Sequence, residues 1–212
     1  MKYTHIIWDF NGTLFDDVDA GIASVNKMLC ERGLSTISNK DEYREVFKFP
    51  IINYYRDLGF DFESEPYEVL APIWVELYNE NSKSSTLCPN ALELLEYFKE
   101  KNIPQVLLSA TERNMLLGQI EELGISGYFD AVLGLDNIHA YSKKDIAIEW
   151  LRKQKDIKPL FIGDTEHDAQ VARAVCADCI LVAQGHQSKA TLLKCGYPVY
   201  NDLGEVMELL KL

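Results

Sequence analysis

Three polar residues that lie far apart in the chain each close a short apolar run. Asp9 closes the first such run, Ser109 the second and Asp164 the fourth. Short apolar runs that end at a polar or small residue are typical of buried strands. In an open parallel sheet, ligands bind beyond the carboxyl ends of the strands. We therefore expect these three side chains to converge at one edge of a sheet.

The residues around them are suited to binding an anion. Gly12, three residues after Asp9, permits a tight turn whose backbone N–H groups can cradle an anion. Residues 109–111 offer hydroxyl groups and, at the expected start of the next helix, free N–H groups that favour negative charge. Lys143 follows Ser142 at the expected start of a later helix and supplies a cation.

Two carboxylates near the fourth run are suited to a metal. Asp164 and Asp168 are four residues apart, so a helix that begins at Thr165 turns the second carboxylate back toward the first. Carboxylate oxygens beside a phosphate site are ligands that Mg²⁺ prefers. Each feature alone has an ordinary explanation, as a turn former, a helix cap or a solvated lysine. Their combination in this order indicates a phosphate and metal site.

The elements that must position these residues follow an α/β pattern. The predicted strands are residues 4–8, 105–108, 131–133, 160–162 and 179–182. From Pro89 onward these strands alternate with amphipathic helical segments, which predicts a parallel sheet covered on both faces. Residues 16–85 interrupt the alternation with helical spacing and no convincing strand. We interpret them as an inserted helical domain.

Four motifs carry a resemblance to a known family. They are Asp-Phe-Asn-Gly-Thr-Leu from residue 9, Leu-Leu-Ser-Ala-Thr from 107, Ser-Lys-Lys-Asp from 142 and Gly-Asp-Thr-Glu-His-Asp from 163. In this order they resemble the haloacid dehalogenase-like (HAD) hydrolase superfamily, and its phosphoglycolate-phosphatase-like members in particular. The resemblance implies an α/β, doubly wound, Rossmann-like core of residues 1–15 and 86–212. It also implies an all-helical cap formed by residues 16–85.

The resemblance also implies a role for each motif residue. Asp9 would be the nucleophile that forms a phosphoaspartate, and Lys143 would neutralise the charge shared by Asp9 and the phosphate. The phosphoryl oxygens would be held by Thr13, Ser109, Ala110 and Lys143. The Mg²⁺ ligands would be Asp9, the backbone carbonyl of Asn11 and Asp164, with Asp168 in a supporting position.

One residue departs from the family pattern. Phosphatases of this family usually carry a second Asp two residues after the nucleophile, where it protonates the leaving group and then activates water. This chain has Asn11 there. An amide can orient water by hydrogen bonding, but it cannot exchange a proton at neutral pH. General acid–base help is typically worth ~10²–10⁴ in rate, or roughly 3–5 kcal/mol.

Several hypotheses accommodate Asn11. The substrate could have a good leaving group, as an acyl phosphate does, or another residue such as Glu166, His167 or Tyr54 could supply the proton. The phosphoenzyme could be long-lived. The chain could also have lost catalysis and serve as a phospholigand-binding or regulatory protein. A metal-independent dehalogenase would likewise lack the second Asp, although the complete motif at residues 163–168 argues for a metal.

The composition narrows the class of partner. The chain of 212 residues is 47% hydrophobic and has a formal net charge of −12, which argues against nucleic acid and anionic membranes as partners. We expect a cytoplasmic phosphatase, monomeric or homodimeric, whose substrate is a small phosphorylated metabolite and whose cofactor is Mg²⁺. Five cysteines without a regular framework fit a reducing compartment. His5, His139 and His186 lack metal-ligand spacing and receive no role.

Overall fold

A six-stranded parallel sheet forms the centre of the protein. The computed structural model describes residues 2–135 and 142–211, so His139 lies outside the described residues. The strand order is β5-β4-β1-β6-β7-β8, and every neighbouring pair is parallel. The strands are β1 (His5–Trp8), β4 (Gln105–Glu112), β5 (Ala131–Leu135), β6 (Pro159–Gly163), β7 (Asp178–Val182) and β8 (Val199–Tyr200).

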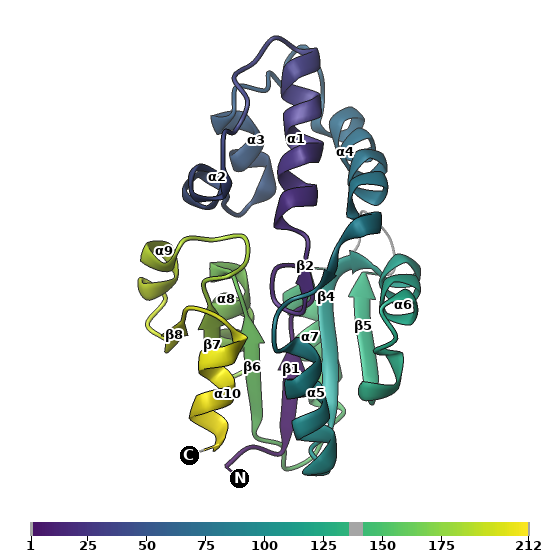
Figure 1. Cartoon of the computed structure of the whole chain (residues 1–212), viewed down its shortest axis with the longest axis vertical. Helices are drawn as coiled ribbons and strands as arrows, with labels where there is room; N and C mark the ends of the chain where they lie inside the picture. The colour runs from purple at the N-terminus through teal and green to yellow at the C-terminus, as the bar shows by residue number, and fades with distance from the viewer. Residues whose placement is uncertain (1, 136–141, 212) are drawn as a thin grey trace.

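Alternation of side chains along the strands builds a core on each face of this sheet. Ile6 and Trp8 of β1 face one apolar cluster, whereas Ile7 faces the other. The first cluster packs against α5 (Ala91–Glu100), α6 (Arg113–Glu122) and α10 (Leu203–Lys211). The second packs against α7 (Lys143–Arg152), α8 (Glu166–Ala174) and α9 (Lys189–Leu193). The predicted doubly wound α/β fold is confirmed (Figure 1).

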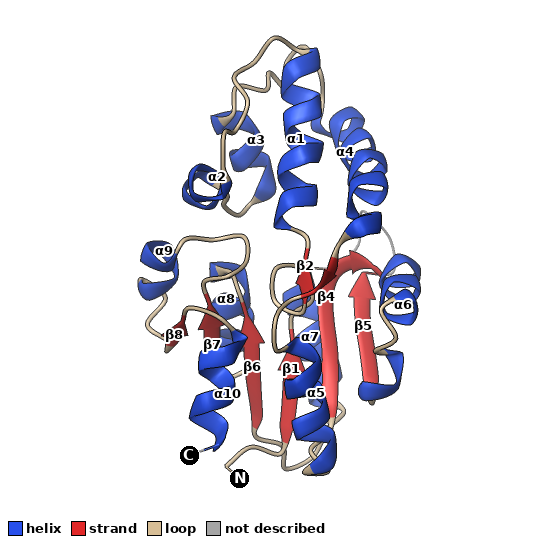
Figure 2. Ribbon diagram, in the orientation of Figure 1, coloured by secondary structure: helices blue, strands red, loops and turns tan. Residues whose placement is uncertain are grey.

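Four helices stand beyond the carboxyl ends of the strands (Figure 2). They are α1 (Val18–Glu31), α2 (Lys40–Val46), α3 (Ile51–Asp57) and α4 (Tyr67–Asn81). Their apolar side chains form a third cluster that contains only residues from 18 to 77. A short antiparallel pair of strands, β2 (Phe15–Asp16) and β3 (Thr86–Leu87), joins this helical block to the sheet. Among the described helices, none is both long and apolar enough to cross a membrane.

The structure corrects the sequence prediction in the second strand. Residues 109–111 were expected at a helix start, but β4 continues to Glu112 and α6 begins at Arg113. The pairing of β4 with β5 shifts register between Leu108 and Glu112, so the segment forms a bulge. A bulge lets the strand bend and re-aims side chains, which suits a binding site at the end of a strand. The sequence pattern also missed β2, β3 and β8, each of which has two residues.

Candidate active site

Three buried carboxylates meet at the carboxyl ends of β1 and β6. Asp9, Asp164 and Asp168 each offer an oxygen, and these oxygens lie within 4.8 Å of one another. Asp9 follows β1 directly, Asp164 follows β6, and Asp168 lies in the first turn of α8. The parallel sheet thus brings together residues that are more than 150 positions apart, at the edge where the strand pattern predicted a site.

Lys143 lies between two of these carboxylates. Its side chain is 3% exposed, and its Nζ donates to Asp9 Oδ1 and, at 2.5 Å, to Asp168 Oδ1. Lys143 is the first residue of α7, and Ser142 caps that helix by accepting from the backbone N–H of Asp145. Lys144 is exposed, so the buried cation of the motif is Lys143.

Two glycines leave room for the carboxylate of Asp164. A Cβ atom at Gly12 or at Gly185 would clash with Oδ2 of Asp164. Gly12 also has φ +71°, a left-handed conformation that strains other residues. Asp164 Oδ2 accepts from the backbone N–H of His186 at 2.6 Å, and Oδ1 accepts from the Thr13 hydroxyl at 3.3 Å. The tight turn predicted at Gly12 therefore packs directly against the acidic cluster.

A capping box fixes Asp168. Thr165 is the N-cap of α8, and its side chain accepts from the backbone N–H of Asp168. In return, Asp168 Oδ2 accepts from the backbone N–H of Thr165 at 3.0 Å and from its hydroxyl at 2.7 Å. Because Oδ2 is held by the cap, Oδ1 remains directed at Lys143. The same carboxylate therefore starts the helix and orients the buried cation.

The charges of this cluster do not balance. Burial and the neighbouring charge of Asp168 raise the pKa of Asp9 to about 6, although Lys143 acts in the opposite direction. Burial raises the pKa of Asp164 well above its usual range. Burial also disfavours the charged Asp168, but Lys143 outweighs it and lowers the pKa of that carboxyl. Only Asp9 and Asp168 pair with Lys143, and a divalent cation bound by hard oxygens would relieve the negative charge around Asp164.

The polar side chains of the β4 bulge meet Asn11. The Asn11 Oδ1 accepts from the Ser109 hydroxyl at 3.2 Å and from the Thr111 hydroxyl at 2.9 Å. The backbone N–H of Thr111 donates to the Ser109 Oγ at 3.0 Å. Ser109 is 1% exposed, whereas Ala110 is exposed and contributes only backbone groups here. Thr13 donates to Asp9 Oδ2 at 3.1 Å, which places it beside the nucleophile candidate.

A second buried network, which the four sequence motifs do not include, lies next to Asn11. Asp17 accepts four hydrogen bonds, from Asn11 Nδ2, the Tyr78 hydroxyl, the Gly12 backbone N–H and His186 Nε2. Burial opposes ionisation of Asp17, but the charge of His186 and these hydrogen bonds lower the pKa of the carboxyl. Burial likewise opposes the charged His186, yet Asp17 raises the pKa of that imidazole to about 9. These residues form a buried ion pair.

Weak signals pointed to parts of this network. The doublet Asp16-Asp17 lies one residue beyond the first motif, so a second acidic group near the site was visible in the sequence. Nothing in the spacing of His186 revealed its partner, because the ring meets Asp17 only through the fold. The partner of Tyr78 is likewise 61 positions away, across the junction between the helical block and the sheet.

The helical block lies directly against the loop that carries His186. The guanidinium of Arg44 donates to the carbonyl oxygens of Gly185 at 2.8 Å and Gln184 at 2.5 Å. The Tyr43 hydroxyl contacts His186 Nδ1 at 2.9 Å. The ring of Phe47 packs against His186, with 5.2 Å between ring centroids. These contacts place the block over the acidic cluster.

The side chains that could replace the missing proton donor have other surroundings and make no hydrogen bond to Asn11 among the described residues. His167 packs on Phe49 with ring centroids 4.8 Å apart, and burial lowers the pKa of its imidazole. Tyr54 lies in the apolar cluster of the helical block, where its buried hydroxyl has no hydrogen-bond partner among the described residues. The backbone N–H of Glu166 bonds to Gln187. Within the described ranges, none of the three bonds to Asn11, Ser109 or Thr111.

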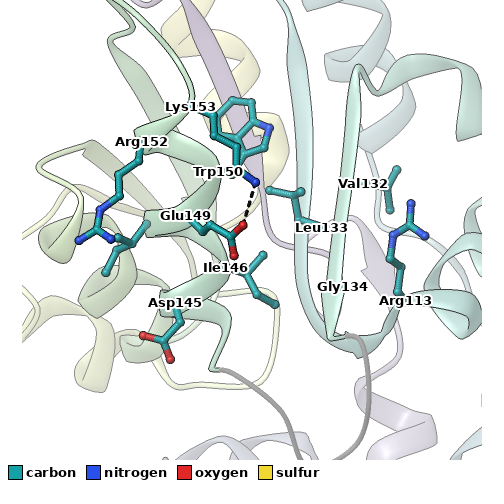
Figure 3. Close-up of a pocket in the computed structure, with 11 residues that line it drawn as sticks. Arg113, Val132, Leu133, Gly134, Asp145, Ile146, Glu149, Trp150, Arg152 and Lys153 are labelled. Carbon is teal, nitrogen blue, oxygen red and sulfur yellow. Dashed lines mark hydrogen bonds and ion pairs between the residues drawn. The ribbon is translucent and has the colours of Figure 1, made fainter.

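A large open cavity lies at a different place, beside the edge strand β5 (Figure 3). Its volume is about 670 Å³, and it is lined by side chains of α7 and β5 together with Arg113. Glu149 and Lys153 form an ion pair of 2.7 Å on its wall. None of the residues that meet around Asp9 lines this cavity. The candidate active site is therefore the buried cluster beneath the helical block.

Comparison with known proteins identifies relatives of the whole fold. The family profile described as haloacid dehalogenase-like hydrolase matches residues 6–182. A phosphoglycolate phosphatase of Rhodobacter capsulatus is 25% identical over 86% of this chain and 85% of its own length. Phosphoglycolate phosphatase 1 of Pseudomonas aeruginosa is 21% identical over 85% of this chain and 70% of its own length.

Solved structures show the same fold with little sequence identity. A haloacid dehalogenase-like family protein of Streptococcus pneumoniae has a TM-score of 0.82 at 21% identity, covering 98% of both chains. Protein tyrosine kinase A of Mycobacterium tuberculosis has a TM-score of 0.81 at 18% identity, covering 99% of both chains. These likenesses establish the fold alone, since one fold can carry several activities. Because the family profile matches residues 6–182, which include Asp9, Lys143, Asp164 and Asp168, the chain belongs to the haloacid dehalogenase-like hydrolases, as a phosphoglycolate-phosphatase-like member.

Proposed function

We propose that the protein is a Mg²⁺-dependent phosphatase that acts on a small phosphorylated metabolite through a phosphoaspartate on Asp9. The observation that carries the proposal is the buried Lys143 ammonium, which contacts both Asp9 and Asp168 beside the third carboxylate of Asp164. Phosphoryl transfer depends mainly on positioning and charge neutralisation. A buried carboxylate held by a buried cation supplies both for a nucleophile.

The reaction has two displacements. An oxygen of the Asp9 carboxylate attacks phosphorus, and the bond from phosphorus to the leaving oxygen breaks with its electron pair on that oxygen. Water then attacks the phosphoaspartate, the pair of the breaking P–O bond returns to Asp9, and the protons of water remain on orthophosphate. Lys143 neutralises charge on Asp9 and on the phosphoryl group throughout. Thr13, Ser109 and the backbone N–H of Ala110 donate to the phosphoryl oxygens.

The residues fit the metal that the family uses. Asp9, the backbone carbonyl of Asn11 and Asp164 would hold Mg²⁺, with Asp168 in a supporting position. The donors are hard oxygens, and the cluster holds more negative than positive charge. When bound, the ion neutralises charge on the phosphoryl oxygens. The same acidic cluster favours phosphoryl transfer over metal-independent dehalogenation, which needs no such surplus of carboxylates.

The position of the helical block over the site argues that the substrate is small. We propose that residues 16–85 act as a cap that closes over residues 1–15 and 86–212 and excludes water from the site. The contacts of α2 with residues 184–188 and the separate apolar cluster of the block support this division. The names of the curated relatives support a phosphorylated metabolite as substrate. A cytoplasmic location and a monomeric or homodimeric state remain predictions.

Phosphate release from an activated aryl phosphate tests the proposed function. We expect the wild-type protein to release phosphate only when Mg²⁺ is present, and Asp9→Asn to release none above the rate without enzyme. Asp19→Asn is the matched control, since that carboxylate is exposed and pairs with Lys40 instead. Activity of Asp9→Asn equal to wild type would show that Asp9 is not the nucleophile. If phosphorylated ligands only raised the melting temperature, without turnover, the phospholigand-binding hypothesis would replace this one.

A further inference from the structure

All four hydrogen-bonding positions of the Asn11 side chain are occupied. A primary amide has two N–H donors and an oxygen with two acceptor positions. The oxygen accepts from the hydroxyls of Ser109 and Thr111 at 3.2 and 2.9 Å. The nitrogen donates to Asp17 Oδ2 at 2.9 Å and to the Tyr78 hydroxyl at 2.8 Å. The amide therefore bridges the β4 bulge and the base of the helical block in one orientation.

Asp17 determines which end of the amide faces which way. Its carboxylate is 1% exposed and can only accept, and it already receives the Tyr78 hydroxyl at 2.5 Å and the Gly12 backbone N–H at 2.8 Å. An amide oxygen turned toward Asp17 would place two acceptors in contact within a buried site, which is costly. The nitrogen of Asn11 is consequently held on the Asp17 side, and the oxygen on the side of Ser109 and Thr111.

This orientation has a chemical consequence at the proposed phosphate site. Ser109 is proposed to donate to a phosphoryl oxygen, and because a hydroxyl has one proton, that donation frees one acceptor position of the Asn11 oxygen beside the phosphoryl group. Residue 11 therefore presents an acceptor to that space, and both of its N–H donors are directed away. An acceptor can orient an attacking water molecule. It gives neither a proton nor a hydrogen bond to a departing oxygen.

We propose that Asp17 and Tyr78 are positioning residues that hold Asn11 as an acceptor, and that the substrates are therefore phosphoryl compounds whose leaving group departs unprotonated, such as acyl phosphates. This inference rests on the proposed function. The acyl phosphate transfers its phosphoryl group to Asp9, and the bond breaks with its electron pair on the carboxylate that leaves. No proton is required in that step. An alkyl phosphate would have to expel an alkoxide, which needs a proton that residue 11 does not provide.

Positions 11 and 17 then form an exchangeable pair. A carboxyl group placed at position 11 alone would face Asp17 at hydrogen-bonding distance, as two buried carboxylates. In Asn11→Asp/Asp17→Asn the carboxyl and the amide trade places, and the number of buried carboxylates stays the same. The double variant therefore moves an acidic group next to the phosphate site without adding charge. Asp17→Asn alone is its matched control, because the two proteins differ only at position 11.

The test is the dependence of kcat/KM on the leaving group. The substrates are aryl phosphates with phenols of graded acidity, acetyl phosphate and ethyl phosphate, all with Mg²⁺ at one pH. We expect kcat/KM of wild type to fall steeply as the leaving group becomes more basic, with acetyl phosphate preferred over ethyl phosphate by at least ~10²-fold, the lower end of general-acid help. The double variant should gain on ethyl phosphate and show the shallowest slope, because only its residue 11 can give a proton. Asp17→Asn frees the Asn11 amide to turn an N–H donor toward the phosphate site, so its slope should lie between those of the wild type and the double variant.

The outcomes separate this inference from the proposed function. A shallow wild-type slope, or efficient hydrolysis of ethyl phosphate, would overturn the acceptor role of Asn11 while phosphatase activity stands. Equal slopes for the double variant and Asp17→Asn would also overturn it. Absence of phosphate release from every substrate would remove the proposed function and this inference with it. If the double variant does not fold, the slope measured for wild type still tests the acceptor role of Asn11, because that measurement needs no substitution. A purely structural role of Asp17 would lower the melting temperature of Asp17→Asn and leave its slope equal to that of wild type, which would overturn the positioning role.

Discussion

At the scale of single residues, Asp164 has the least favourable surroundings of the three clustered carboxylates. It is fully buried, Gly12 and Gly185 make room for it, and burial raises the pKa of its carboxyl well above the usual range. The charged form is therefore disfavoured in the folded protein when no cation compensates it. The buried carboxylate of Asp164 therefore lowers the free energy of unfolding of the metal-free protein, and it provides a ligand for a cation.

This cost predicts the behaviour of Asp164→Asn. Without metal, the variant should be more stable than wild type, by about 1 kcal/mol or roughly 2–4 °C in melting temperature for a chain of this length. Mg²⁺ should raise the melting temperature of wild type and leave that of the variant nearly unchanged. Differential scanning calorimetry with EDTA and with Mg²⁺ measures both effects. Asp41→Asn, at an exposed carboxylate, serves as the control, and a destabilised Asp164→Asn in EDTA would contradict the prediction.

Residues of the motifs could be found in the sequence because each follows a recognisable strand or opens a recognisable helix. Asp9, Lys143 and Asp164 belong to this group, and the structure brings them together. Asp17, Tyr78 and His186 could not be found in this way. Their contacts with one another cross 61 and 169 positions of the chain, so no local spacing encodes them. Their roles depend on how the helical block packs against the sheet.

At the scale of elements, helix caps position the reactive groups. The capping box of α8 holds Asp168 with two hydrogen bonds from Thr165, and the free oxygen of that carboxylate then meets Lys143. A cap of this kind both satisfies the first N–H groups of a helix and orients the residue that closes it. In this protein, the first turn of α8 therefore fixes the position of Lys143 at the start of α7.

Removing that cap should affect stability and activity together. Thr165→Ala should lower the free energy of unfolding by about 1 kcal/mol, the typical loss for a Thr cap, and should also reduce kcat because Asp168 loses its fixed orientation. Asn39→Ala removes the N-cap of α2, where the side chain accepts from the backbone N–H of Glu42. It should destabilise the protein by a similar amount without changing kcat. Urea unfolding and steady-state kinetics on both variants make the comparison.

The longer elements of the fold were predictable and the shortest were not. The strands of the central sheet carry continuous apolar runs, and α1 and α4 carry clear helical spacing, so their periodicity reveals them. Strands of two residues, such as β8, have no periodicity to detect. The extension of β4 to Glu112 was hidden because the bulge carries the hydroxyl side chains of Ser109 and Thr111, which indicated a helix cap.

At the scale of the whole molecule, polar contacts hold the helical block against the sheet. Arg44 contributes two of them, to carbonyl oxygens of the loop that follows β7. The cores on the two sides of this contact are separate clusters. Motion of the block as a unit would consequently break these contacts and leave both cores intact.

Arg44→Ala should shift the molecule toward more open arrangements. We expect a larger radius of gyration by small-angle X-ray scattering and a higher KM, with cooperative unfolding retained. Arg56→Ala is the control, because that guanidinium bonds to Asn53 and lies over the ring of Phe62 inside the block. Identical scattering from wild type and both variants would show that Arg44 does not hold the block against the sheet.

The two short strands at the base of the block have a further consequence, for how such a protein can be rebuilt. Asp16 and Thr86 are paired across β2 and β3, so the chain leaves the sheet and returns to it at neighbouring points. A segment whose ends already lie side by side can be lengthened, shortened or exchanged without disturbing the order of the six parallel strands. A different helical domain can therefore be inserted between β2 and β3 while the parallel sheet and its site residues stay in place.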